Sequence, residues 1–329
     1  MVSLPRASRF LVFLGGILFA ACSNAAVRTP YPTAHLPTII AATSQAARPQ
    51  PSSSPSPSPA PSPLPTAQPT PTPRPSPRPT PLPTPTAHPT PLFLAYPQII
   101  GYSVEGRPLI VYRFGSGPDA RLIVAGIHGG NEWNTIALAE QLIGYLRLHP
   151  DVLPADKSLY ILPNLNPDGE ARAHGVDGRA NAHGVDLNRN WPYRWAADWD
   201  RTHCWAYRPV TAGPAPASEP ETQALMHFIQ AIHPAALISY HSAALGVFAG
   251  GVPAFAPSEH LAATLARAGG YRYPAVDIGC DYTGNLTDWA SSVLGIPAVD
   301  IELTDHTHTD FEKNLRVLQA FLHWRSPTP

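Results

Sequence analysis

From Ile99 onward, apolar residues recur with the periods of strands and helices in turn. Short, nearly continuous apolar runs predict buried strands at 122–127, 158–162, 235–240 and 297–303. Helical spacing predicts helices at 133–148, 218–232 and 311–324. Strands that alternate with helices form a sheet covered on both faces. We therefore predict an α/β fold with a mixed, largely parallel central sheet and helices on both of its faces.

Two local motifs mark the limits of predicted elements. Glu105-Gly106-Arg107-Pro108 separates the apolar segments 102–104 and 109–114, which favours a hairpin. Ser218 stands three residues before Glu221 at the start of the second predicted helix, which is the spacing of a capping box. In sheets of this kind, functional sites form at the carboxyl ends of the strands, so the residues that follow the strands are the first candidates for chemistry.

Proline divides the chain of 329 residues into two parts. Of its 42 prolines, 23 lie between Pro30 and Pro97, mostly alternating with Ser, Thr or Ala. Such a segment cannot bury enough apolar surface to offset its loss of conformational entropy, and it favours polyproline II. We predict a disordered Pro-, Ser- and Thr-rich linker over 23–97, followed by one folded domain over 98–329.

The start of the chain has the pattern of an export signal. Arg6 and Arg9 precede an apolar run over 10–21 that is too short to span a bilayer, and this predicts a signal peptide over 1–22. Phe-Ala-Ala-Cys at 19–22 resembles the processing box of bacterial lipoproteins, which implies a lipid on Cys22 as the only membrane attachment. An ordinary signal peptide would instead imply secretion. Both alternatives place the protein outside the cytoplasm, the first of them at the cell envelope.

Charge and cysteine content describe the folded domain further. All 23 acidic residues lie from Glu105 onward and six of the 22 basic ones precede Gln98, so the domain carries a net charge of −7. An acidic domain argues against nucleic-acid binding. Cys204 and Cys280 remain besides Cys22, and an even pair outside the cytoplasm can form a disulfide. The alternative is two unrelated buried thiols.

Ionisable residues follow the predicted strands. His128 and Glu132 come directly after the first buried run, and His241 and Glu302 stand at the ends of two others. Imidazole and carboxylate are ligand types of zinc, although a lone His at the end of a buried strand is more often a core residue. His128 and Glu132 are therefore candidates to share a metal ion, and His241 and Glu302 are either core residues or residues of a site.

An arginine-rich loop lies between the second and third predicted strands. It holds Arg179, Asn188 and Arg189 and no lysine. Guanidinium and amide groups can bind a carboxylate in bidentate fashion, the alternative being a solvated loop. Asn-Pro-Asp-Gly at 166–169 has the composition of a turn.

Taken together, these motifs resemble the zinc metallocarboxypeptidases, the carboxypeptidase A-like enzymes. The resemblance covers nearly all of 98–325. It rests on His128 and Glu132, Asn-Pro-Asp-Gly at 166–169, Gly-Arg-Ala-Asn at 178–181, Asp-Leu-Asn-Arg-Asn at 186–190, His-Ser at 241–242 and Ile-Glu-Leu at 301–303, with further similarity over 103–108 and 283–289. It implies the fold of that family, one zinc ion and hydrolysis of the C-terminal peptide bond of peptides.

The resemblance also implies a role for each candidate residue. The implied zinc ligands are His128, Glu132 and His241, with Asp186 as the acceptor that orients His128. The implied catalytic groups are Glu302 as general base and Arg179 facing the developing oxyanion. The implied substrate contacts are Asn188 and Arg189 on the terminal carboxylate, Tyr282 over the substrate and Thr287 in the pocket for the terminal side chain.

The sequence departs from the family pattern at the first ligand pair. Three residues separate His128 from Glu132, where two are usual, so Asn131 occupies the expected position and is a poor zinc ligand. Gly129 and Gly130 permit a turn that is one residue longer, which keeps Glu132 as the predicted ligand.

The residues predicted to line the pocket also depart from the family pattern. Tyr282 lies closer to Asp288 than in the mammalian digestive enzymes, and Thr287 is neither the aliphatic nor the acidic variant of its position. The segment 193–218 is rich in tryptophan and looks like a variable loop near the pocket.

We predict a monomeric zinc carboxypeptidase, a metallopeptidase whose partner is a peptide with a free C-terminus. The nearest alternative is an amidase of the same fold that trims cell-wall peptides at diamino acids. An alternative from another class is a surface binding protein that kept the fold and lost catalysis. A third is a metal site at His306 and His308, which otherwise are polar residues before a helix.

Overall fold

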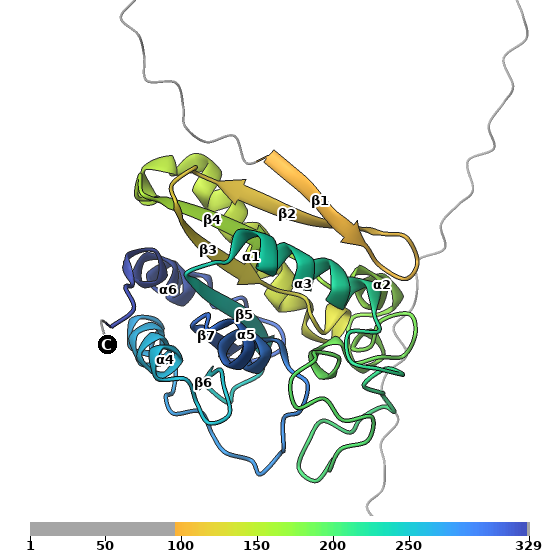
Figure 1. Cartoon of the computed structure of the whole chain (residues 1–329). Coiled ribbons are helices and arrows are strands. Elements are labelled where there is room, and N and C mark those ends of the chain that lie inside the picture. The colour runs from red at the N-terminus through yellow and green to blue at the C-terminus, as the bar shows by residue number, and fades with distance from the viewer. Residues whose placement is uncertain (1–95, 328–329) are drawn as a thin grey trace, which may run out of the picture. The chain divides into compact units, whose positions relative to one another are not determined.

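The computed structural model describes residues 96–327, and its centre is a seven-stranded mixed sheet (Figure 1). The strand order is β1-β2-β4-β3-β5-β7-β6. The strands are β1 Tyr96–Tyr102, β2 Pro108–Phe114, β3 Asp119–Val124, β4 Lys157–Leu162, β5 Ala236–Ser242, β6 Val247–Ala249 and β7 Ala298–Leu303. Strands β4, β3, β5 and β7 run parallel, and β1, β2 and β6 flank them in antiparallel pairing. The mixed α/β sheet is confirmed, with its parallel part in the four central strands.

Helices cover both faces of this sheet. They are α1 Trp133–Leu148, α2 Pro167–Arg172, α3 Pro220–Ile232, α4 Ala256–Gly269, α5 Leu286–Leu294 and α6 Phe311–His323, with short 3-10 turns η1 Gly129–Glu132, η2 Pro150–Val152, η3 Val176–Gly178 and η4 Leu187–Arg189. Helices α1, α4 and α6 share one core, and α3 and α5 share the other. Successive side chains of a strand point to opposite faces, so Ile123 joins the first core whereas Leu122 and Val124 join the second.

Most predicted elements lie where the apolar pattern placed them. The predicted helix 133–148 is α1 without a shift, and the predicted strand 158–162 is β4 with one more residue at its start. The predicted hairpin is formed by β1 and β2, but its first strand runs over Tyr96–Tyr102 instead of 102–104. Residues 103–105 leave the sheet because the Ser103 hydroxyl and the Glu105 N–H donate to Asp168, at 2.6 and 3.0 Å.

The predicted capping box at Ser218 and Glu221 is wrong. Helix α3 begins at Pro220, and the Ser218 hydroxyl donates to the Glu219 carboxylate at 2.7 Å instead of capping a helical N–H. Glu221 is fully buried and accepts a hydrogen bond from the N–H of Val104 at 3.1 Å. A contact distant in the sequence therefore overrides the local motif.

The segment 166–169 is the start of a helix instead of a simple turn. The side-chain oxygen of Asn166 accepts a hydrogen bond from the N–H of Gly169 at 2.9 Å and so caps α2. This is the local hydrogen bonding that favours asparagine at such positions.

The predicted signal peptide 1–22, Cys22 and nearly all of the predicted linker 23–97 lie outside the described residues. Their roles, the location outside the cytoplasm and the monomeric state stay predictions. Strand β1 begins at Tyr96, two residues before the predicted start of the folded domain. Within residues 96–327, no helix combines the length and the apolar character needed to cross a membrane.

Candidate active site

The first two candidate ligands come from the turn that joins β3 to α1. His128 precedes η1, and Glu132 is the last residue of η1. Gly129 has a φ of +47°, and a Cβ at Gly130 would lie 1.9 Å from the carbonyl oxygen of Ala173, so this turn requires both glycines. It brings Oε1 of Glu132 to 2.7 Å from Nδ1 of His128. The longer turn predicted from the sequence therefore places Glu132 at the site.

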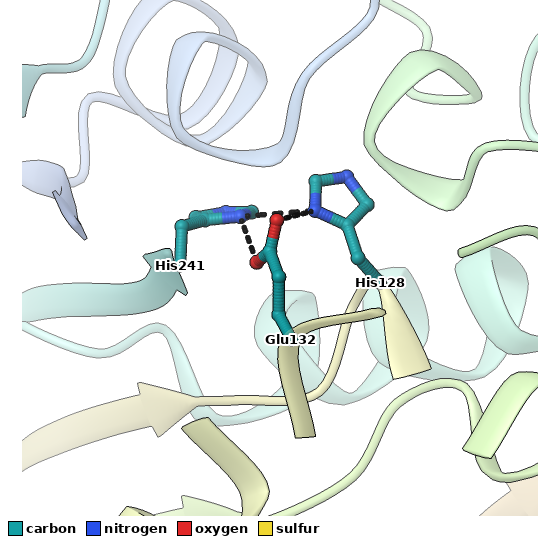
Figure 2. Close-up of side chains that lie close together, drawn as sticks. All are labelled: His128, Glu132 and His241. Atoms are coloured by element: carbon teal, nitrogen blue, oxygen red, sulfur yellow. Dashed lines mark hydrogen bonds and ion pairs between the residues drawn. The ribbon is translucent and has the colours of Figure 1, made fainter. Parts of the chain in front are cut away.

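The third candidate ligand comes from the neighbouring strand. His241 lies on β5, and its Nδ1 is 3.1 Å from Oε2 of Glu132 and 3.3 Å from Nδ1 of His128 (Figure 2). One ligand atom from each of these three buried residues lies within 4.8 Å of the others. The site thus holds two imidazoles and one carboxylate facing a common point.

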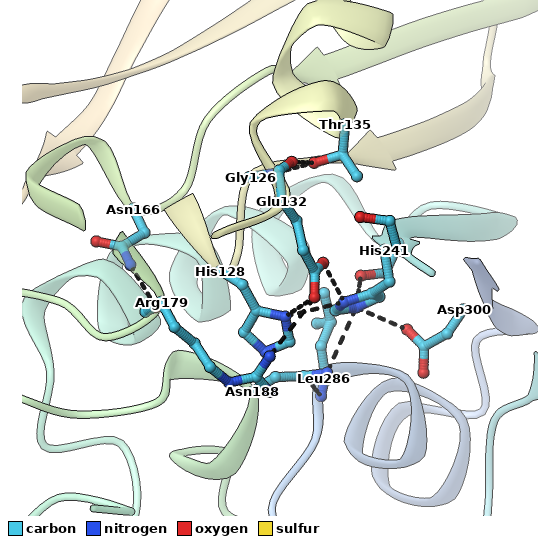
Figure 3. A network of polar contacts seen from close by, with 12 residues as sticks. Gly126, His128, Glu132, Thr135, Asn166, Arg179, Asn188, His241, Leu286 and Asp300 are labelled. Carbon is cyan, nitrogen blue, oxygen red and sulfur yellow. Dashed lines mark hydrogen bonds and ion pairs between the residues drawn. The ribbon is translucent and has the colours of Figure 1, made fainter. Parts of the chain in front are cut away.

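The outer nitrogens of both histidines have their own partners. Nε2 of His128 is 3.1 Å from Oδ1 of Asp186, and Nε2 of His241 is 3.0 Å from the hydroxyl oxygen of Ser239. Figure 3 shows both rings in the polar network around Glu132. When Nε2 carries the proton in each ring, both Nδ1 atoms present lone pairs at 3.3 Å from each other. A shared cation relieves that repulsion, and two imidazoles with one carboxylate are a donor set that zinc prefers.

The electrostatics of the triad also fit a cation. Burial lowers the pKa of His241, but the charge of Glu132 and a contact with Asp300 raise it well above the usual value. Burial raises the pKa of Glu132, but the two histidines lower it below the usual range. Each group is therefore stabilised in the charged form by its neighbours. A bound zinc ion supplies the same positive charge without protonating either ring.

Arg179 and Asp186 support one side of the triad. A guanidinium nitrogen of Arg179 lies 2.9 Å from Oδ2 of Asp186, and another lies 3.5 Å from Oε1 of Glu132. Burial raises the pKa of Asp186, but the charges of Arg179 and His128 hold it well below the usual value. Asp186 is therefore an anion in contact with both His128 and Arg179.

Glu302 lies beside the triad on β7, directly opposite His241 in the strand register. Its Oε2 is buried and has no hydrogen-bond partner in the described part of the chain. Burial first, and then the charge of Glu132, raise the pKa of Glu302 to about 8. A cation held by the triad favours the ionised form, so this carboxyl is able to gain and lose a proton near neutral pH.

A pocket with a volume of about 720 Å³ opens next to the triad. Besides the three ligands, it is lined by the predicted site residues Arg179, Asn188, Arg189, Tyr282, Thr287 and Glu302. The amide oxygen of Asn188 accepts from the N–H of Leu286 at 3.0 Å, and this fixes the start of α5 beside η4. Residues from five of the six predicted motifs, together with Thr287, thus share one cavity.

The sequence profile of the family described as zinc carboxypeptidase matches residues 93–319, which is more than half of the chain. The chain belongs to the zinc carboxypeptidase family. Its family is one of metallopeptidases that use zinc, and the His-Glu-His triad is able to bind one such ion. The resemblance inferred from the motifs is confirmed.

Individual relatives agree with this assignment. The chain is 35% identical over 157 residues to murein peptide amidase A of Escherichia coli K12, which covers 43% of this chain and 57% of the relative. It is 30% identical over 254 residues to carboxypeptidase A6 of Mus musculus, which covers 64% of this chain and 56% of the relative. The chain thus spans little more than half the length of these relatives. The crystal structure of murein-tripeptide amidase MpaA from E. coli O157 has a TM-score of 0.55 and 27% identity, and the match covers 72% of this chain and 95% of that one.

A tryptophan-rich loop covers the arginines of the pocket. The guanidinium carbon of Arg179 lies 4.6 Å from the ring centre of Trp205, and that of Arg189 lies 5.8 Å from the ring centre of Trp199. Cys204 is joined to Cys280 by a disulfide with a Cα–Cα distance of 4.9 Å, which ties this loop to the segment before Tyr282. The density of tryptophan at 193–218 indicated a loop near the pocket, but not which rings cover which arginine.

The alternative metal site at His306 and His308 is not formed in the described part of the chain. His308 is exposed, and its Nδ1 lies 2.7 Å from Oδ2 of Asp305. His306 is 3.0 Å from the hydroxyl of Ser242 and lines the rim of the pocket. Among residues 96–327, the metal-binding group is the one made by His128, Glu132 and His241.

Proposed function

We propose that this protein is a carboxypeptidase that removes the C-terminal residue of peptides. The observation that carries the proposal is Arg189. It is buried in the pocket, and no acidic side chain pairs with it among residues 96–327. Its Nε has no hydrogen-bond partner there, and burial lowers its pKa. A buried cation without an anion is costly unless a ligand brings one.

A terminal carboxylate is the anion that suits this position. Guanidinium binds carboxylate with paired N–H donors, and the adjacent ring of Tyr282 has its centre 5.4 Å from the guanidinium carbon. A peptide bond in the middle of a chain offers no such anion. Binding of the terminal carboxylate to Arg189 therefore places only the last peptide bond beside the triad. An enzyme with this requirement is an exopeptidase.

The other groups of the pocket have roles in the hydrolysis itself. His128, Glu132 and His241 would hold the zinc ion, which would supply a Lewis acid for the scissile carbonyl and would make an attacking water more acidic. Glu302, whose Oε2 has no hydrogen-bond partner among residues 96–327, takes the proton of the attacking water and delivers it to the leaving amine. Arg179 faces the carbonyl oxygen on which negative charge develops, and Asp186 holds Arg179 in that position.

A second candidate function is the hydrolysis of cell-wall peptides. The similarity to murein peptide amidase A of E. coli, at 35% identity, favours it. The structural match to murein-tripeptide amidase MpaA extends over 95% of that chain. The two functions share the triad and Glu302, and they differ in the substrate that the pocket accepts.

Assays of the zinc-loaded protein on blocked dipeptides and on muropeptides test the proposal. We expect release of the C-terminal amino acid from blocked dipeptides, because the buried Arg189 needs only a terminal carboxylate. Mass spectrometry of the products identifies the bond that is cut. Hydrolysis of muropeptides alone would overturn the carboxypeptidase and establish the cell-wall amidase.

A further inference from the structure

Two irregular segments contribute to the wall of the pocket. The tryptophan segment, residues 193–207, and the tyrosine segment, residues 277–282, contain neither helix nor strand. Both supply side chains that line the cavity. Irregular backbone lacks the repeated hydrogen bonds that fix a helix or a strand, so its position depends on the particular links that it makes.

Each segment places an aromatic ring over an arginine of the site. The guanidinium carbon of Arg179 lies 4.6 Å from the ring centre of Trp205, and that of Arg189 lies 5.4 Å from the ring centre of Tyr282. Both arginines are buried. A ring over a guanidinium attracts its charge and excludes water, which strengthens the pairing of the cation with an anion. The affinity of the pocket for a carboxylate therefore depends on where these two rings lie.

The backbone of the tyrosine segment is held only at its two ends. Before it, the N–H of Val276 donates to the carbonyl of Leu245 at 2.8 Å. After it, the carbonyl of Gly284 accepts from the N–H of Trp191 at 3.0 Å. Between these points, no backbone group of the tyrosine segment is hydrogen-bonded to the rest of the described chain. Side chains must therefore hold this segment over the pocket.

Among residues 96–327, two polar or covalent links join the two segments directly, and one of them is an ion pair. The guanidinium of Arg194 donates to the carboxylate of Asp281 at 2.8 Å, and these side chains are 36% and 55% exposed. Water screens a pair that is this exposed, so it restrains the segments only weakly. Most of the restraint has to come from the second link.

The second link is the disulfide between Cys204 and Cys280. Cys204 directly precedes Trp205, and Cys280 lies two residues before Tyr282. Both cysteines line the cavity. One covalent bond, which water does not weaken, thus restrains the backbone beside both rings.

We propose that the Cys204–Cys280 disulfide is a positioning element of the substrate pocket: it holds Trp205 and Tyr282 over the two arginines and so sets the affinity for the terminal carboxylate of a substrate. This inference rests on the proposed exopeptidase function. The candidate zinc ligands and Glu302 come from η1, β5, β7 and the turn before η1, none of which the disulfide joins. Loss of the bond should therefore weaken binding much more than hydrolysis.

Replacing both Cys204 and Cys280 with serine tests the inference in the zinc-loaded full chain. For a blocked dipeptide with a free C-terminus, we expect KM to rise about 5- to 30-fold, the difference between a buried and an exposed charged hydrogen bond. We expect kcat to fall less than about 3-fold and zinc content to stay the same. Loss of a disulfide lowers thermal stability wherever the bond lies, so Tm does not decide the question. An unchanged KM would overturn the inference.

A double-mutant cycle identifies the route by which the bond acts. In a background that lacks both rings, Trp205→Ala with Tyr282→Ala, the cysteine substitutions should change KM less than about 2-fold, because the bond then has no ring to position. Effects on KM that simply add would show that the bond acts elsewhere in the fold, and would contradict the inference. Arg208→Gln is the matched control. Arg208 follows the tryptophan segment, pairs with Asp177 and lies outside the cavity lining, so its replacement should leave KM unchanged.

Reduction of the folded enzyme covers the case in which the serine variant does not fold. A phosphine gives two electrons to the disulfide and the S–S bond breaks. Water supplies the two protons of the thiols and the oxygen of the phosphine oxide. KM should rise by the same factor and return on reoxidation. A constant KM, while mass spectrometry finds two thiols and metal analysis finds the zinc retained, would overturn the inference.

Chemical modification of arginine gives a readout that does not depend on turnover. Phenylglyoxal reacts with exposed guanidinium groups, and mass spectrometry locates the product. Reaction at Arg179 and Arg189 should become several-fold faster after reduction, whereas the exposed Arg208 should react equally in both forms. Failure of the proposed function would appear as no release of any C-terminal residue, and the modification would still decide what the bond holds. Equal rates at Arg179 and Arg189 in both forms would contradict the inference.

Discussion

Replacing Glu302 with glutamine is expected to lower kcat by about 10²- to 10⁴-fold, the usual contribution of a general acid–base group. The amide keeps the shape of the side chain but cannot take a proton from water. Oε2 of Glu302 has no partner in the described residues, so the substitution breaks no hydrogen bond at that atom. Because Glu302 lies outside the triad, the variant should still bind one zinc ion. Steady-state kinetics together with metal analysis on the same preparation measure both effects.

Glu140→Gln is a matched control for this change. Glu140 is exposed on α1, outside the pocket, and its replacement should leave kcat unchanged. Undiminished turnover in Glu302→Gln would show that another group is the base. Loss of zinc from Glu302→Gln would instead assign Glu302 to the metal site.

Replacing His128 with alanine should remove zinc and activity together. The substitution takes away one of three ligands, and even the loss of an outer group that orients a ligand typically weakens metal binding 10- to 100-fold. We therefore expect zinc affinity to fall by more than about 100-fold and kcat/KM to fall with it at limiting zinc. Metal content after dialysis against a weak chelator measures the first effect, and a zinc titration of activity measures the second.

His306→Ala provides the comparison, since His306 lies at the rim of the same pocket and contacts Ser242 instead of the triad. This variant should keep its zinc. Zinc retained in His128→Ala and lost in His306→Ala would place the metal elsewhere and would contradict the assigned triad.

The apolar pattern predicts much of this fold for a physical reason. Central parallel strands are buried on both faces, so β3, β4, β5 and β7 are nearly continuous apolar runs, and α1 has a clear helical period. Helices α4 and α5 lie in a stretch for which we predicted no element. The predicted capping box at Ser218 is wrong because the Glu221 carboxylate accepts hydrogen bonds from Val104 and Asn181, which lie far away in the sequence.

The candidate site also has one part that the sequence predicts and another that only the structure reveals. The triad is predictable because zinc requires particular residue types and because His128 and Glu132 are close in sequence, although only the geometry of the glycine turn decides between Asn131 and Glu132. Asp300 is not predictable, since it stands inside an apolar run. Only the register of β5 and β7, together with the position of α5, brings it to His241 and Thr287.

The disulfide likewise depends on the fold. Cys204 and Cys280 are 76 residues apart, and the sequence left open whether they were bonded. The structure joins them beside the pocket, which places Trp205 over Arg179. The location outside the cytoplasm stays a prediction.

The central claim is that this zinc enzyme works on free C-termini, and one peptide assayed as its free acid and as its C-terminal amide tests it most directly. Mass spectrometry follows the products with the zinc-loaded protein and after chelation. We predict release of single residues from the free acid, at a rate at least about 30-fold above that for the amide, since the amide leaves the buried charge of Arg189 unpaired. In Arg189→Gln this difference should shrink to a few-fold. Equal cleavage of the acid and the amide, or cleavage at internal bonds, would contradict the account.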